Sequence, residues 1–263
     1  MELENYTKSN AKAIDNWVKD GWVWGIPISE ENCTKARQGE WDVVLTPTKS
    51  VPKDWFGNLQ GKKVLGLASG GGQQMPIFAL LGANCTVMDL SDMQLESERK
   101  VAARENYQIE IIKADMTKKF PFADNSFDLI FHPVSNCYVE DIQHIWNECY
   151  RVVKPNGTLL SGLDNGLNYL FDEDIAGKPL IVTNTLPFNP LKNPQQMAKL
   201  VANEDDSIQF SHTFEEQIAG QLKAGFVITA AYEDYNHDPL GIEKFATEIA
   251  NIPAFWATKA VKM

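Results

Sequence analysis

Residues 63–72, KVLGLASGGG, are the most informative segment of this chain. Its apolar run predicts a short buried strand, which breaks into three consecutive glycines at 70–72 ahead of a candidate helix. Glycine lacks a Cβ and tolerates positive φ, so such a turn lets backbone approach a ligand closely. Because proline is tolerated only in the first turn of a helix, Pro76 predicts a helix start near Gly72 or Gln73.

An acidic residue follows at the spacing expected for a ribose contact. Residues 83–89, ANCTVMD, predict a second strand that ends in Asp89, 19 residues past Gly70. In nucleoside-binding α/β folds, an acid about 20 residues after the glycine turn accepts hydrogen bonds from ribose hydroxyls. Ser91 and Gln94 form a capping box, which predicts a helix directly afterwards. The turn and Asp89 together therefore favour a nucleoside ligand.

Two cofactor classes share this signal. The dinucleotide fingerprint G-x-G-x-x-G, aligned on Gly70, lacks its outer glycines at Ala68 and Gln73, which weakens an NAD(P)-dependent oxidoreductase. Residues 64–72 resemble instead the first motif of class I S-adenosylmethionine (SAM) methyltransferases, V-L-D-x-G-x-G-x-G, in both apolar positions and the last two glycines. They depart from it at Gly66, where that family carries an acid, and at Ala68. The missing acid keeps a non-catalytic SAM-binding protein as a further alternative.

More of the chain joins this resemblance, from about residue 59 to residue 163. Residues 109–115, IEIIKAD, predict a third strand, and residues 121–139 resemble the loop and fourth strand that follow the adenine site in that family. RVVKPNG at 151–157 is similar to the family's R-x-L-K-P-G-G turn. The order from LASGGGQQ to FHPVSNC also resembles a little-characterised bacterial branch, close to the type 11 methyltransferases.

The resemblance implies an α/β, Rossmann-like, doubly wound and mostly parallel seven-stranded sheet with an antiparallel C-terminal hairpin. The alternation of strand and helix patterns agrees with a parallel sheet covered on both faces. We expect a SAM-binding domain over residues 61–263, with an irregular insertion at about 164–212, where Asp, Asn and Pro are frequent. Thr213 and Glu216 form a second capping box, after which a helix should end near Gly225.

A separate N-terminal cap is expected over residues 1–60. Four of the seven tryptophans lie between Trp17 and Trp41, and Trp55 follows. Aromatic clusters usually belong to a packed core, which is the favoured interpretation for most of these residues. The alternative is a lid that closes over a ligand cleft.

Ligand groups of a parallel sheet gather at the carboxyl ends of its strands. His132, at the end of the fourth strand, is the candidate general base or substrate-positioning residue because imidazole titrates near neutral pH. A histidine that bonds loop backbone before Pro133 is an equal alternative, and Asp115 has a plain turn residue as its competitor. The resemblance implies these cofactor-binding residues: Ala68, Ser69, Gly70, Gly72, Gln73, Asp89, Leu90, Asp115, Met116 and His132.

The composition of the chain limits the classes of partner, cofactor and cellular compartment that we expect. A net charge of −11 and a pI of about 4.9 disfavour nucleic acid. The four cysteines lie singly, so we expect buried thiols, a reducing cytoplasm and no metal site. We expect no membrane span and no signal peptide. With the resemblance, these features predict a cytoplasmic SAM-dependent enzyme that methylates a small molecule, with RNA or protein as less favoured acceptors.

Overall fold

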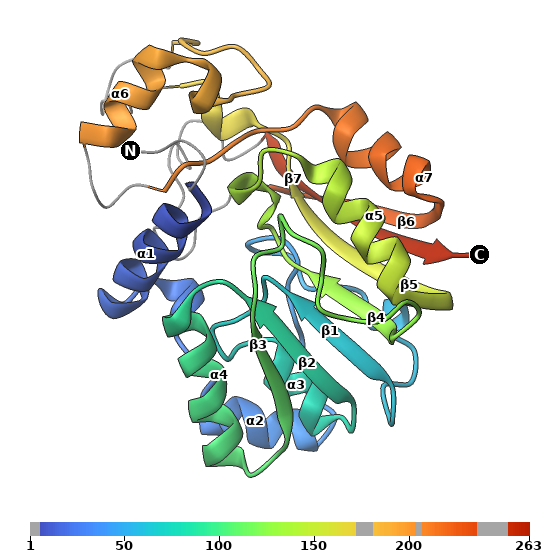
Figure 1. Cartoon of the computed structure of the whole chain (residues 1–263). Coiled ribbons are helices and arrows are strands. Elements are labelled where there is room, and N and C mark those ends of the chain that lie inside the picture. Colours follow the sequence, from blue (N-terminus) through green and yellow to red (C-terminus); the bar gives the residue numbers. More distant parts are fainter. Residues whose placement is uncertain (1–5, 172–180, 203–206, 236–251) are drawn as a thin grey trace.

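The computed structural model describes residues 6–171, 181–202, 207–235 and 252–263 (Figure 1). One seven-stranded sheet has the strand order β3-β2-β1-β4-β5-β7-β6, in which the first five strands pair in parallel and β7 pairs antiparallel with both β5 and β6. This confirms the predicted fold. The strands are β1 (Lys63–Leu67), β2 (Asn84–Asp89), β3 (Ile109–Lys113), β4 (Phe127–His132), β5 (Val153–Asp164), β6 (Phe226–Tyr235) and β7 (Pro253–Lys262).

Helices cover both faces of the sheet. The α-helices are α1 (Tyr6–Lys19), α2 (Glu30–Arg37), α3 (Met75–Leu80), α4 (Asp92–Glu105), α5 (Ile142–Val152), α6 (Pro194–Ala202) and α7 (Gly220–Ala224), the last preceded by a π-helical turn at Glu215–Ala219. Alternate residues of β1 belong to opposite cores, as the period of a strand requires. Val64 packs with α2, α3 and residues 43–59, whereas Leu65 packs with α5.

Local sequence explains where the first helices begin. Gly71 and Gly72 have φ values of 95° and 69°, which a right-handed helix cannot contain, so α3 begins at Met75 and not at the expected Gly72 or Gln73. Ser91 caps α4, because its Oγ accepts the N–H of Gln94 at 3.1 Å. The Gln94 amide does not complete the capping box, since it donates to the carbonyl of Trp24.

The later boundaries follow similar reasons. Thr213 and Glu216 form the predicted capping box in both directions, and Gly225 ends α7 in a left-handed conformation. β5 begins at Val153, inside the stretch that resembles the family's turn, because residues 153–157 pair irregularly with the start of β4 before the regular ladder begins. Asn156 adopts a positive φ of 63° inside this irregular stretch.

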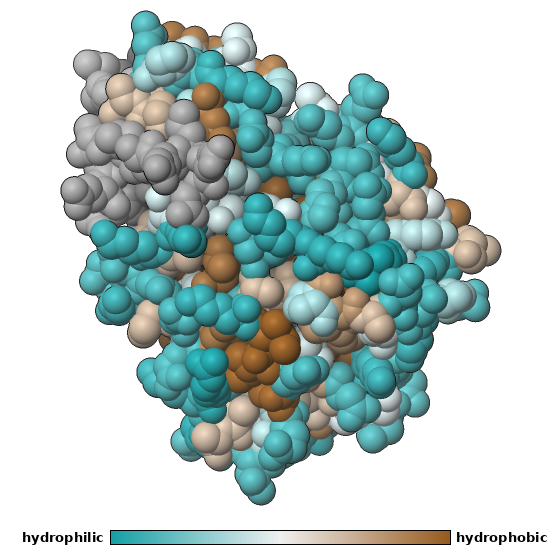
Figure 2. Space-filling model, in the orientation of Figure 1, coloured by the Kyte–Doolittle hydropathy of each residue, from teal (hydrophilic) through white to brown (hydrophobic). Residues whose placement is uncertain are grey.

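The N-terminal segment and the insertion lie at the edge of the sheet toward which β1 and β2 point. Figure 1 shows α1 beside the upper end of α4, with α6 above it. Residues 172–180 and 203–206 of the insertion, and residues 1–5 of the expected cap, lie outside the described residues. Hydrophilic residues cover much of the face in Figure 2, with an apolar area over the region of β3. None of the helices in the described ranges is long and apolar enough to cross a membrane.

Candidate active site

A cavity of about 1100 Å³ opens at the carboxyl ends of the parallel strands. It continues under α1 and along the insertion between β5 and α7. Its volume exceeds the 300–1000 Å³ typical of a pocket for one small ligand. Eight of the ten predicted cofactor-binding residues line it: Ala68, Ser69, Gly70, Gln73, Asp89, Leu90, Asp115 and Met116. Gly72 and His132 do not line it.

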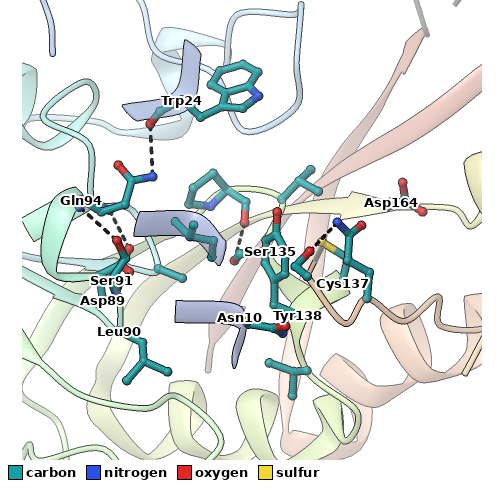
Figure 3. Close-up of a pocket in the computed structure, with 18 of the residues that line it drawn as sticks. Asn10, Trp24, Asp89, Leu90, Ser91, Gln94, Ser135, Cys137, Tyr138 and Asp164 are labelled. Carbon is teal, nitrogen blue, oxygen red and sulfur yellow. Dashed lines mark hydrogen bonds between the residues drawn. The ribbon is translucent and has the colours of Figure 1, made fainter. Parts of the chain in front are cut away.

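Asp89 ends β2 with its carboxylate at the cavity wall, as Figure 3 shows beside Ser91 and Gln94. Its Oδ2 accepts the N–H of Gly70 at 3.1 Å and its Oδ1 accepts the N–H of Ser91 at 3.0 Å. Burial raises the pKa of Asp89, and these N–H donors partly offset that rise. A carboxylate oxygen has two acceptor sites, so Asp89 keeps capacity for ligand hydroxyls.

The glycine turn is tightly packed against α4. A Cβ on Gly70 would lie 2.7 Å from the Cβ of Gln94, and one on Gly72 would lie 2.8 Å from the carbonyl of Ser97. The N–H of Gly72 donates to the buried Glu98 at 2.8 Å. Gly72 was predicted to bind cofactor, but the structure gives it a packing position behind the turn.

Asp115 joins the turn after β3 to the N-terminal helix. Its Oδ1 accepts both the backbone N–H and the hydroxyl of Thr117, at 2.8 and 2.7 Å. Its Oδ2 accepts the hydroxyl of Thr7 at 2.8 Å. Asp115 is therefore the turn residue that the sequence allowed, and its carboxylate also faces the cavity with Met116.

His132 lies in the core, and this corrects its prediction as a group that touches cofactor or substrate. The side chain is 0% exposed, with Nδ1 3.0 Å from the carbonyl of Leu67 and Nε2 2.8 Å from Oδ1 of Asn136. Burial lowers the pKa of His132, which favours a neutral ring. The contact of Nδ1 with the carbonyl of Leu67 places the single ring proton on Nδ1. The Asn136 Nδ2 has no partner among the described residues, so rotating this amide would supply the donor that Nε2 needs.

The helix α1 bridges two walls of the cavity. The carboxylate of Asp15 accepts the hydroxyl of Ser91 at 2.6 Å and the N–H of Met93 at 3.0 Å, at the start of α4. The buried amide of Asn10 pairs with the backbone of Ile208, donating at 2.8 Å and accepting at 2.7 Å. α1 therefore links the nucleoside side of the cavity to the insertion.

Some of the N-terminal tryptophans belong to the packed core, and others line the cavity, as a lid would require. Trp55 is 7% exposed and belongs to the core that covers β1, and Trp41 packs against that core. Trp17, Trp22 and Trp24 line the cavity instead, and the rings of Trp17 and Trp22 meet edge to face at 5.4 Å. Residues 17–24 thus carry three of the aromatic side chains that face the cavity.

The far end of the cavity holds residues that were not predicted. Asp164 ends β5, and the insertion adds aromatic and amide side chains that include Tyr169, Phe188 and Gln209. In Figure 3, Asp164 lies on the opposite side of Ser135 and Tyr138 from Asp89. The Asp- and Asn-rich composition of the insertion favoured turns, and only the predicted place of the insertion after the fifth strand pointed to this wall.

The polar groups at the ends of β1, β2 and β3 fit a bound SAM. Ser69 Oγ and Gln94 Oε1 are buried at the cavity wall and have no hydrogen-bond partner among the described residues. Such orphaned groups can pair with the polar methionine portion of SAM. The carboxylates of Asp89 and Asp115 also suit a ligand that carries a sulfonium charge.

Comparison with known proteins agrees with this geometry. Residues 65–161 match the family model described as "Methyltransferase domain". The chain is 41% identical over 227 residues to the uncharacterized methyltransferase YbaJ of Bacillus subtilis, covering 86% of this chain and 89% of that protein. It is 29% identical over 207 residues to the ubiquinone/menaquinone biosynthesis C-methyltransferase UbiE of a Ruegeria species, covering 74% and 75%.

A solved structure shares the fold. It is an S-adenosylmethionine-dependent methyltransferase from Mesorhizobium loti, with a TM-score of 0.61, 19% identity and coverage of 80% of this chain and 94% of that chain. These likenesses decide against the NAD(P)-dependent oxidoreductase. The chain belongs to the class I SAM-dependent methyltransferases, and it is an enzyme of that family with SAM as its cofactor.

Proposed function

We propose that this enzyme transfers the methyl group of SAM to a small-molecule acceptor by in-line displacement. The observation that carries the proposal is the cavity of about 1100 Å³, which extends from the ends of β1, β2 and β3 to the insertion. One end has the polar groups that suit a nucleoside, and the other has an aromatic wall. Such a cavity has room for two ligands end to end.

The chain's residues have separate tasks in this proposal. Asp89 accepts hydrogen bonds from the ribose, Asp115 and Met116 hold the adenine edge, and residues 68–73 hold the methionine portion. Bound SAM supplies a reactive methyl group on a sulfonium. The protein's contribution is therefore to align the acceptor with the bond that breaks and to exclude water.

The enclosure of the cavity supports a small acceptor. α1 ties the start of α4 to the backbone of Ile208, so the acceptor has to fit between this helix and the strand ends. We propose residues 6–24 as a lid over the cavity, which refines the expected cap of residues 1–60. The UbiE relative is named for ubiquinone and menaquinone biosynthesis, and this also favours a small acceptor.

The net charge supports an acceptor other than nucleic acid, and the cysteines support a cytoplasmic location. A net charge of −11 opposes binding to nucleic acid, whose phosphates need cationic partners. All four cysteines are free, buried thiols, which suits a reducing cytoplasm.

Radiolabelled methyl transfer tests the proposal. SAM labelled in its methyl group is incubated with the enzyme and a cell extract, and label is counted in dialysable compounds, protein and RNA. We expect label in the dialysable fraction, and much less of it with an Asp89→Ala variant. Label that accumulates in RNA or protein would contradict a small-molecule acceptor.

A further inference from the structure

The far end of the cavity has one charged side chain among its described residues. The sheet order places Asp164, at the end of β5, two strands away from the glycine turn after β1. The carboxylate Oδ1 accepts the N–H of Gly166 at 2.6 Å. No hydrogen bond joins its Oδ2 to the described residues, and Asp164 lines the cavity. This oxygen is therefore placed to meet a ligand.

Aromatic side chains surround this end. Tyr169 stacks on Phe188 with ring centroids 5.4 Å apart, and its hydroxyl donates to Gln209 at 2.7 Å. Burial, with the nearby charge of Asp164 as a further cause, raises the pKa of Tyr169 well above its ordinary value, so its phenol stays neutral. Tyr138, Phe171 and Phe255 also line the cavity. Aromatic faces beside a carboxylate favour a cationic group.

The charges of the whole cavity also favour a cationic group on the acceptor. The charged side chains among its described lining residues are Asp20, Asp89, Asp115 and Asp164, and none of the described lining residues is lysine, arginine or histidine. An acceptor that carries a carboxylate or a phosphate would meet repulsion here without a compensating cation. A neutral nucleophile that becomes positive as it gains a methyl group is stabilised by the same field.

From this arrangement we infer that the acceptor is an amine, and that Asp164 binds its N–H and receives its proton. The inference rests on the proposed methyltransferase function and extends it to the chemical class of the substrate. The nitrogen lone pair forms the new N–C bond while the S–C bond breaks, and the electron pair of that bond stays on sulfur. The proton of the methylated nitrogen passes to Oδ2 of Asp164 and from there to water.

The acidity of Asp164 suits this task. Burial raises the pKa of its carboxyl to about 7, although the N–H of Gly166 acts in the opposite direction. A base works best when its pKa lies near the working pH. Asparagine at this position keeps an oxygen for the N–H of Gly166, so the variant removes the charge and preserves the fold.

Calorimetric titration with three ligands of matched size tests the inference by binding alone. Benzylamine, benzyl alcohol and benzoate are titrated into enzyme saturated with S-adenosylhomocysteine. We expect benzylamine to bind at least tenfold more tightly than benzoate, and Asp164→Asn to abolish this preference. The control Asp54→Asn removes the same charge at an exposed position outside the cavity and should keep it. Equal affinity for benzoate, or an unchanged preference in Asp164→Asn, would overturn the inference.

A methyl-transfer assay provides a second test of the inference that the acceptor is an amine. The expected product from a panel of arylalkylamines is the N-methylated amine, and Asp164→Asn should lower its rate roughly 100-fold. Methylation confined to phenols or to carbon acceptors would overturn the inference while leaving the methyltransferase function in place. Failure of the wild type to bind S-adenosylhomocysteine would instead refute the proposed function, so the two failures are distinguishable.

Discussion

Replacing Glu98 by glutamine is predicted to change how the stability of the protein depends on pH. Glu98 lies on α4 behind the glycine turn and is 0% exposed. Its Oε1 accepts the N–H of Gly72 at 2.8 Å, whereas its Oε2 has no partner among the described residues. Burial raises the pKa of Glu98 from 4.5 to about 8, with the charge of Asp89 as a further cause and the Gly72 bond as a partial offset.

The sign and the size of the effect follow from proton linkage. Between pH 4.5 and 8 the unfolded chain has lost the Glu98 proton and the folded chain has kept it, so the folded state binds more protons. The free energy of unfolding therefore falls by about 1.4 kcal/mol for each pH unit in this window. Over the whole window the loss reaches about 5 kcal/mol, and it stops above the folded pKa.

Urea denaturation followed by tryptophan fluorescence, at several pH values from 5 to 8, measures the effect. Titrating groups that are not coupled to Glu98 contribute equally to wild type and Glu98→Gln, so the difference between the two proteins reports Glu98 and its coupling to Asp89. The variant loses an acid but keeps an acceptor for Gly72, and we expect it to gain stability relative to wild type as pH rises. The control Glu96→Gln, at a side chain 46% exposed on the same helix, should follow wild type. If the difference in free energy of unfolding between Glu98→Gln and wild type stays constant with pH, the pKa of Glu98 is not raised in the folded protein.

Two further substitutions test the packing of the site. Gly66→Asp restores the acid of the family motif, but its Cβ would lie 2.5 Å from Sδ of the buried Met75. We therefore expect the free energy of unfolding, measured by urea denaturation, to fall by about 3 kcal/mol. Adding Met75→Ala should recover part of this loss. Wild-type stability of the single variant would contradict this. Asn10→Ala leaves the buried N–H and carbonyl of Ile208 unpaired, which should cost about 2–4 kcal/mol and speed the release of S-adenosylhomocysteine in stopped-flow experiments. An unchanged release rate would argue against α1 as a lid.

The strands, and the gathering of Gly70, Asp89 and Asp115 at one cavity, could be predicted because both depend on local pattern. Residues 63–67 and 84–89 are apolar runs that end at a glycine turn or an acid, and parallel pairing brings such ends to one edge. The start of α3 was placed too early, because proline limits where a helix can begin without showing that Gly71 and Gly72 are left-handed.

The burial of His132 and the end of the cavity at Asp164 could not be predicted in the same way. His132 leaves a strand end as expected, but its contacts with the carbonyl of Leu67, 65 residues earlier in the chain, and with Asn136 hold its ring in the core. Asp164 falls in a stretch whose Asp and Asn residues are typical of turns. The role proposed for it depends on Tyr169, Phe188 and Gln209, which line the same cavity only in the folded chain.

The binding of S-adenosylhomocysteine is the sharpest test of the cofactor site proposed at the ends of β1, β2 and β3. Calorimetric titration should show binding to wild type and to an Asp54→Ala control. Asp89→Ala removes charge-assisted hydrogen bonds worth about 1.5–3 kcal/mol each, so its affinity should fall roughly 30-fold or more. Wild-type affinity in Asp89→Ala, with the variant folded, would contradict the placement of the cofactor.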